Sequence, residues 1–111
     1  VIAKGTGVGT KKISGKARVI KVASEASKKF KTGDILVTTS TNNEILPYMK
    51  KASAIVVGPV TNPENCHAEI VGRALDIPVI MCNAKVIDFI SNDSLITVDP
   101  VKGFIYSGKP E

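Results

Sequence analysis

Several residue types are scarce in this chain, and each scarcity narrows what the protein can be. Two cysteines, Cys66 and Cys82, are too few for the disulfide framework of a small secreted domain, and they lack the ligand spacing of a structural zinc site. Tryptophan is absent, and three phenylalanines and two tyrosines give no recognisable surface for stacking nucleic-acid bases. No apolar run approaches the roughly 20 residues that a membrane helix requires. We therefore expect a single cytoplasmic domain without a membrane anchor.

Acidic residues are scarce in the first third of the sequence. Nine of the fifteen basic residues precede Gly33, and only Glu25 opposes them there. Such a cluster could attract a polyanion, or it could be a solvated face that complements an acidic neighbour. Because no stacking signature accompanies the charge, the second interpretation is favoured and nucleic acid is not expected as a partner.

The N-terminal segment is rich in glycine and has little hydrophobic periodicity. Residues 1–15 contain Gly5, Gly7, Gly9 and Gly15, a composition typical of a linker. We expect a linker-like segment over residues 1–15 and one domain over residues 16–111. Since the chain begins with Val1 in place of an initiator Met, we also expect it to be part of a longer polypeptide.

Hydrophobic periodicity and turn residues predict a mixed α/β domain. Thr41 and Glu44 have the spacing of a capping box, which predicts a helix from there to Ala52. The helix after Asn65 should bury Ile70, Val71, Ala74 and Leu75. The remaining expected elements are strands over 16–22, 35–39, 53–57 and 79–81, helices over 24–30, 65–76 and 86–90, and a closing hairpin that pairs 95–98 with 104–106.

The chain has one histidine, and it lies where a loop is expected to become a helix. His67 occurs in the segment Asn65-Cys66-His67-Ala68-Glu69. A helix N-terminus presents unpaired backbone donors and partial positive charge, which would stabilise a phosphoryl group attached to the imidazole. His67 is therefore a candidate nucleophile. Cys66 could also act as a nucleophile, but side chains of adjacent helical residues diverge, and a zinc site built from Cys66, His67 and Cys82 lacks the usual spacing.

The segment around His67 resembles a known family. Phosphoenolpyruvate-using phosphotransferases carry a mobile domain with the signature Gly-Gly-x-Thr-Ser-His-Ala-Ala, an apolar helix and Gly-Ile-Pro. The matching positions here are His67, Ala68, Ile70, Val71, Arg73, Leu75, Ile77 and Pro78. The resemblance implies a swivelling β/β/α domain of the phosphohistidine type, in which His67 stands at the phosphate-carrying position.

A longer match involves the blocks over residues 33–41, 50–55, 96–99 and 106–108. These blocks resemble the extra C-terminal domain of bacillus-type bacterial pyruvate kinases. That resemblance implies a structural and regulatory domain that contacts other domains and subunits of a homotetramer. Catalysis, together with magnesium and a monovalent cation, would belong to a separate barrel, and this domain itself would need no cofactor.

The sequence departs from the family signature where phosphate would be bound. Asn62 and Pro63 stand at the glycine pair, and Asn65 and Cys66 replace Thr-Ser. Glu69 replaces the second alanine, where its charge would repel a phosphoryl group unless it points away. These departures favour the regulatory domain of a pyruvate kinase. A phosphocarrier with His67 as transient phosphohistidine is the alternative, and a basic polyanion-binding module is the second alternative.

Overall fold

The computed structural model describes residues 2–21, 24, 28–39, 41, 44–60 and 66–108. Eight strands form one mixed sheet in the order β1-β8-β7-β3-β4-β5-β6-β2. The strands are β1 (Ala3–Lys4), β2 (Thr6–Val8), β3 (Ile13–Val19), β4 (Ile35–Thr38), β5 (Ala54–Val57), β6 (Val79–Met81), β7 (Leu95–Asp99) and β8 (Phe104–Ser107). The helices are α2 (Leu46–Met49), α3 (His67–Leu75) and the 3-10 turn η1 (Val86–Asp88).

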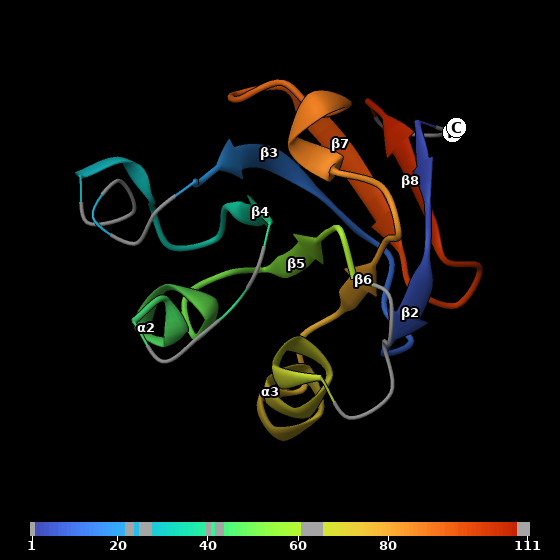
Figure 1. Ribbon diagram of the computed structural model, residues 1–111, viewed down its shortest axis with the longest axis horizontal. Coiled ribbons are helices and arrows are strands. Elements are labelled where there is room, and N and C mark those ends of the chain that lie inside the picture. Colours follow the sequence, from blue (N-terminus) through green and yellow to red (C-terminus); the bar gives the residue numbers. More distant parts are fainter. Residues whose placement is uncertain are drawn as a thin grey trace.

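The sheet curves until its two ends are joined. Strands β1 and β2 stand at opposite ends of the strand order, yet only Gly5 separates them along the chain. β1 pairs antiparallel with β8, and β2 pairs antiparallel with β6. The segment over residues 3–8 therefore closes the sheet into a barrel-like shape, with α2 and α3 on the outside (Figure 1).

The linker-like segment expected over residues 1–15 is strand at Ala3–Lys4, at Thr6–Val8 and from Ile13 onward, so that expectation is wrong for most of its length. The glycines there allow close packing. A Cβ on Gly7 would lie 1.9 Å from the carbonyl oxygen of Pro100, and a Cβ on Gly5 would lie 2.3 Å from that of Met81. The glycine content predicts flexibility, but at Gly5 and Gly7 the missing side chain lets one backbone lie directly against another.

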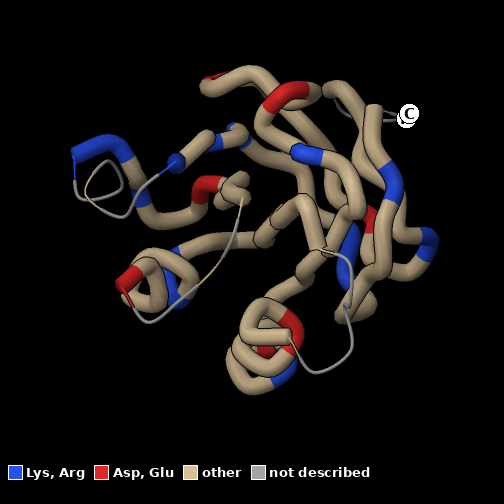
Figure 2. The backbone as a smooth tube through the Cα atoms, in the orientation of Figure 1, with Lys and Arg blue, Asp and Glu red and all other residues tan. Residues whose placement is uncertain are grey.

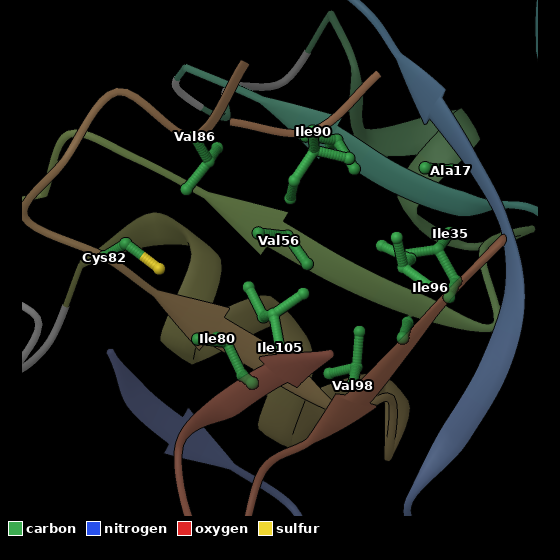
Figure 3. Packing of buried hydrophobic residues seen from close by; sticks show 12 residues of the cluster. Ala17, Ile35, Val56, Ile80, Cys82, Val86, Ile90, Ile96, Val98 and Ile105 are labelled. Carbon is green, nitrogen blue, oxygen red and sulfur yellow. The ribbon is translucent and has the colours of Figure 1, made fainter. Parts of the chain in front are cut away.

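Alternation along the parallel strands builds two hydrophobic clusters. In β4, Ile35 and Val37 face the interior of the barrel, while Leu36 faces the helices. The interior cluster is Ala17, Ile35, Val37, Ala54, Val56, Ile80, Cys82, Val86, Ile90, Ile96, Val98 and Ile105 (Figure 3). A second cluster between sheet and helices includes Ile20, Leu36, Ile55, Met49 and Ala68. The central strands are buried on both faces, as their continuous apolar runs predict.

Most expected elements are confirmed, with shifts at their ends. Strands 35–39, 53–57 and 79–81 and the closing hairpin are present, and the 86–90 helix is the shorter turn η1. Ser24, Lys28 and Lys29 are helical, while the rest of the helix expected after Ser24 falls largely outside the described residues. No helix among the described residues is long and apolar enough to cross a membrane.

Candidate functional site

The ends of two parallel strands and the start of one helix meet around a shallow hollow. Thr39 and Thr41 follow β4, Pro59 and Val60 follow β5, and His67 opens α3. The hollow has a volume of about 150 Å³, and Val57, Cys66 and Ala68 complete its lining. Because β4 and β5 pair in parallel, their carboxyl ends lie at the same edge of the sheet, where ligand sites of α/β proteins commonly form.

Helix α3 begins and ends at well-defined backbone conformations. Cys66 is extended (φ −73°, ψ 162°), and its carbonyl accepts the amide of Ile70 at 3.1 Å. At the other end Asp76 adopts the left-handed conformation (φ 56°), and Ile77 donates to the carbonyl of Gly72 at 3.0 Å. The histidine is therefore the first helical residue, where the backbone amides of the first turn have no partner within the helix.

The face that α3 buries differs from the expected one. Ala68 and Gly72 are buried, and Val71 packs against the cluster beneath the helix. Ile70 is 56% exposed, and Ala74 is also exposed. The expectation that Ile70 and Ala74 are buried is thus wrong. The small residues Ala68 and Gly72 let the helix pack closely on the sheet, and this turns the buried face by about one residue from the expected one.

The imidazole of His67 is held by a hydroxyl from another element. Nδ1 lies 2.8 Å from Oγ1 of Thr41, and the ring is partly exposed in the hollow. Nδ1 donates or accepts in this bond according to the tautomer. Within the part of the chain that the structure describes, Nε2 has no hydrogen-bond partner. When Nδ1 carries the proton and donates to Thr41, the Nε2 lone pair is available for nucleophilic attack.

Thr41 is the site residue that sequence reasoning missed. Its spacing to Glu44 predicted a capping box, but α2 begins at Leu46 after Ile45, which makes no side-chain capping bond. The capping box is therefore wrong, and the hydroxyl contacts the imidazole instead. The position of Thr41 just after a predicted strand was the available signal, because such positions gather at the carboxyl edge of a parallel sheet.

Cys66 is turned toward the protein core. Its Sγ lies 3.2 Å from Sδ of Met81, and its side chain forms no hydrogen bond that caps the helix. Cys82 lies in the interior cluster, where burial raises the pKa of its thiol to about 11. Among the described residues no three His, Cys, Asp or Glu side chains form a metal-binding group. The structure therefore does not bring Cys66, His67 and Cys82 together as a zinc site.

The carboxylate of Glu69 is directed along the helix. Its Oε1 lies 3.5 Å from Nε of Arg73, one turn further on, and its side chain is only 15% exposed. The guanidinium partly offsets the charge that was expected to repel a phosphoryl group. Asn62, Pro63 and Asn65, the other phosphate-loop candidates, lie outside the described residues, so their role stays a prediction.

Comparison with known proteins agrees with this architecture. Residues 30–103 match the family described as PEP-utilising enzyme, mobile domain. The chain belongs to this family. The mobile domain is 41% identical to a pyruvate kinase of Lactobacillus delbrueckii subsp. bulgaricus over 108 residues, which cover 97% of this chain but 18% of that protein. It is 39% identical to a probable phosphoenolpyruvate synthase of Archaeoglobus fulgidus over 113 residues, 14% of that protein.

Solved structures confirm the fold of the mobile domain. Aconitase X of Thermococcus kodakaraensis superposes with a TM-score of 0.68 at 18% identity, covering 96% of this chain and 98% of that one. Enzyme I (nEIt) superposes with a TM-score of 0.60 at 18% identity, covering 73% of this chain and 33% of that one. At such low identity the likeness concerns the fold alone, which is the swivelling β/β/α type expected from the sequence.

Proposed function

We propose that this chain is a phosphoryl-carrying domain in which Nε2 of His67 is the acceptor. The observation that carries the proposal is the hydrogen bond between Nδ1 and Oγ1 of Thr41, which directs the other ring nitrogen away from the threonine at the start of α3. A phosphoryl group at Nε2 would lie near the amides of the first helical turn, which have no partner within the helix, and an anion is stabilised at such a position. The donor class is phosphoenolpyruvate, by analogy with the named activity of the synthases that the domain resembles.

The proposed transfer uses one nucleophile from this chain, Nε2 of His67. The Nε2 lone pair attacks phosphorus, an N–P bond forms, and the P–O bond to the enol oxygen breaks with its electron pair. The enolate then takes a proton from solvent and becomes pyruvate. Nδ1 keeps its proton throughout and remains a hydrogen-bond donor to Oγ1 of Thr41. The imidazole therefore carries the phosphoryl group without losing this hydrogen bond.

A second candidate is the regulatory domain of a pyruvate kinase. It is supported by 41% identity, over 97% of this chain, to the pyruvate kinase of Lactobacillus delbrueckii subsp. bulgaricus. In this case the domain contacts other domains and subunits of a homotetramer in the cytoplasm, and His67 takes no phosphate. Magnesium and a monovalent cation would serve only the barrel of the parent enzyme. The two candidates differ in one measurable property, covalent phosphate on His67.

The test is phosphorylation of the full-length protein that contains this chain. After incubation with phosphoenolpyruvate labelled in its phosphoryl group, we expect an acid-labile, base-stable label that is absent from His67→Gln. The Cys66→Ser variant should keep the label, which distinguishes phosphohistidine from a phosphorylated thiol. Failure of the unmodified protein to take any label would reject the phosphocarrier and favour the pyruvate kinase domain.

A further inference from the structure

The fold gathers two basic segments that lie about twenty residues apart in the sequence. Asp34 donates its amide to the carbonyl of Lys31 at 3.0 Å in the turn before β4, and Gly33 donates to the carbonyl of Lys51 at 2.9 Å just before β5. Phe30 packs edge to face on Tyr48, with ring centroids 6.1 Å apart, and so holds the first segment against α2. Figure 2 shows both segments on the α2 side of the molecule.

The side chains on these segments form an exposed cationic surface. Lys28, Lys31, Lys50 and Lys51 are all exposed, and we call this surface the lysine end. The nearby carboxylate of Asp34 does little to offset it. Asp34 is buried, and its Oδ2 accepts from Nε of Arg18 at 3.1 Å and from the backbone amide of Lys31 at 3.1 Å. Asp34 is thus engaged by a buried guanidinium that also pairs with Asp93 at 2.7 Å.

The lysine end lies at the opposite edge of the sheet from His67. The lysines precede β4 and β5, whereas Thr39, Thr41, Pro59 and Val60 follow the same two parallel strands. At roughly 3.3 Å per residue, a four-residue strand and its flanking residues separate the two edges by about 15 Å. A partner bound at the lysine end would therefore leave the hollow beside His67 accessible.

We infer that the lysine end docks on an acidic protein surface, such as a carboxylate-rich face of a neighbouring domain or subunit. Its cations are all lysines, which act as strongly hydrated point charges. Arginine forks are preferred for phosphate recognition, and this surface has none among its described residues. The aromatic rings at this end, Phe30 and Tyr48, pack on one another and do not form a platform for bases. The chemistry fits transient electrostatic docking of protein on protein.

The test compares two triple variants of equal charge. Lys31→Glu/Lys50→Glu/Lys51→Glu alters the lysine end, and Lys4→Glu/Lys11→Glu/Lys102→Glu alters exposed lysines elsewhere. Each substitution subtracts two charges, so both variants change the formal net charge from +5 to −1. The probe is a fluorescent polyglutamate peptide, titrated at low ionic strength, where the Debye length is about 30 Å. Thermal unfolding followed by circular dichroism checks that both variants are folded.

We expect the lysine-end variant to weaken peptide binding at least about tenfold and the matched control less than about threefold. His67→Gln should bind like the unmodified protein, so the result is independent of phosphoryl transfer. Equal weakening by both triples, or no binding of the unmodified protein, would overturn the inference. Tighter binding of duplex DNA than of the peptide at the same salt would overturn it in favour of nucleic acid. If the reversals unfold the chain, the corresponding Lys→Gln triples replace them.

Discussion

At the scale of single residues, the imidazole of His67 depends on one hydroxyl for its orientation. The 2.8 Å contact joins Nδ1 to Thr41, a residue 26 positions away in the sequence. A typical net hydrogen bond is worth about 1 kcal/mol, which corresponds to about a fivefold change in an equilibrium or a rate. In the proposed transfer Thr41 is therefore a positioning residue that acts through His67.

Thr41→Val removes the hydroxyl and keeps the branched shape of the side chain. We expect the two ring tautomers of His67 to become more evenly populated, and phosphoryl uptake to slow about fivefold. The ¹⁵N chemical shifts of Nδ1 and Nε2 measure the tautomers directly, even if no phosphate is transferred. Thr41→Ser should restore both readouts, and Thr10→Val, on an exposed loop, should change neither. Unchanged ¹⁵N shifts in Thr41→Val would contradict the positioning role.

The buried thiol of Cys82 makes stability depend on pH in the alkaline range. Burial raises its pKa from 9.0 to about 11, so between these values the folded chain keeps a proton that the unfolded chain loses. Stability from this thiol is fully present below pH 9 and is lost as the pH rises toward 11. We expect the loss to reach about 2 kcal/mol at pH 11.

Urea unfolding between pH 8 and 11 provides the measurement. Cys82→Ala should unfold at lower urea at pH 8, because it leaves a small cavity, but its stability should fall less steeply with pH. Val56→Ala, in the same interior cluster, is the control and should keep the steeper fall of the unmodified protein. Parallel pH profiles for Cys82→Ala and Val56→Ala would show that the thiol does not titrate as stated.

At the scale of elements, strand β2 packs unusually closely against the turn between β7 and β8. A methyl group on Gly7 would lie 1.9 Å from a backbone oxygen of Pro100, which no side-chain movement can relieve. On Gly15 of β3 the same group would lie 3.5 Å from the side chain of Ile35, an ordinary contact. The two glycines have the same covalent structure but different packing.

Gly7→Ala should therefore destabilise the fold by about 3 kcal/mol or more, because the strand must move away from the β7–β8 turn. Gly15→Ala is the matched control, and we expect a change within about 1 kcal/mol. Chemical denaturation followed by circular dichroism gives both values. Similar stabilities for the two variants would mean that β2 does not lie against Pro100.

The elements predictable from the sequence are those whose signal is local. A window of a few residues is enough to predict the apolar strands β4 and β5 and the turn between β7 and β8. β1 and β2 could not be found in this way, because Gly5 between them and Gly7 of β2 pack against the backbone of Met81 and Pro100, far along the chain. The residues of the candidate site also differ in how far the sequence predicts them. His67 was found from its helix N-terminus, while Thr41 has a role only once β4 and α3 are brought together.

At the scale of the whole molecule, the first strands join the two ends of the sheet. Ile2 donates to the carbonyl of Ile105 at 2.7 Å, and Gly5 donates to that of Gly103 at 2.8 Å. Across the same segment, Thr6 and Val8 are in register with Met81 and Val79 of β6. Without it, both β8 and β6 would present unpaired edges, and the interior cluster would lose one wall.

Deletion of residues 1–8 should therefore lower the free energy of unfolding by several kcal/mol and promote association through the exposed strand edges. A linker would behave differently, because its removal leaves the domain stable and monomeric. Replacement of Thr10-Lys11-Lys12, an exposed connection between β2 and β3, by Gly-Ser-Gly is the control and should cost about 1 kcal/mol or less. Urea unfolding and light scattering measure the two effects. A deleted chain as stable and monomeric as the control would restore the linker interpretation and show that closure of the sheet by residues 3–8 contributes little to the free energy of unfolding.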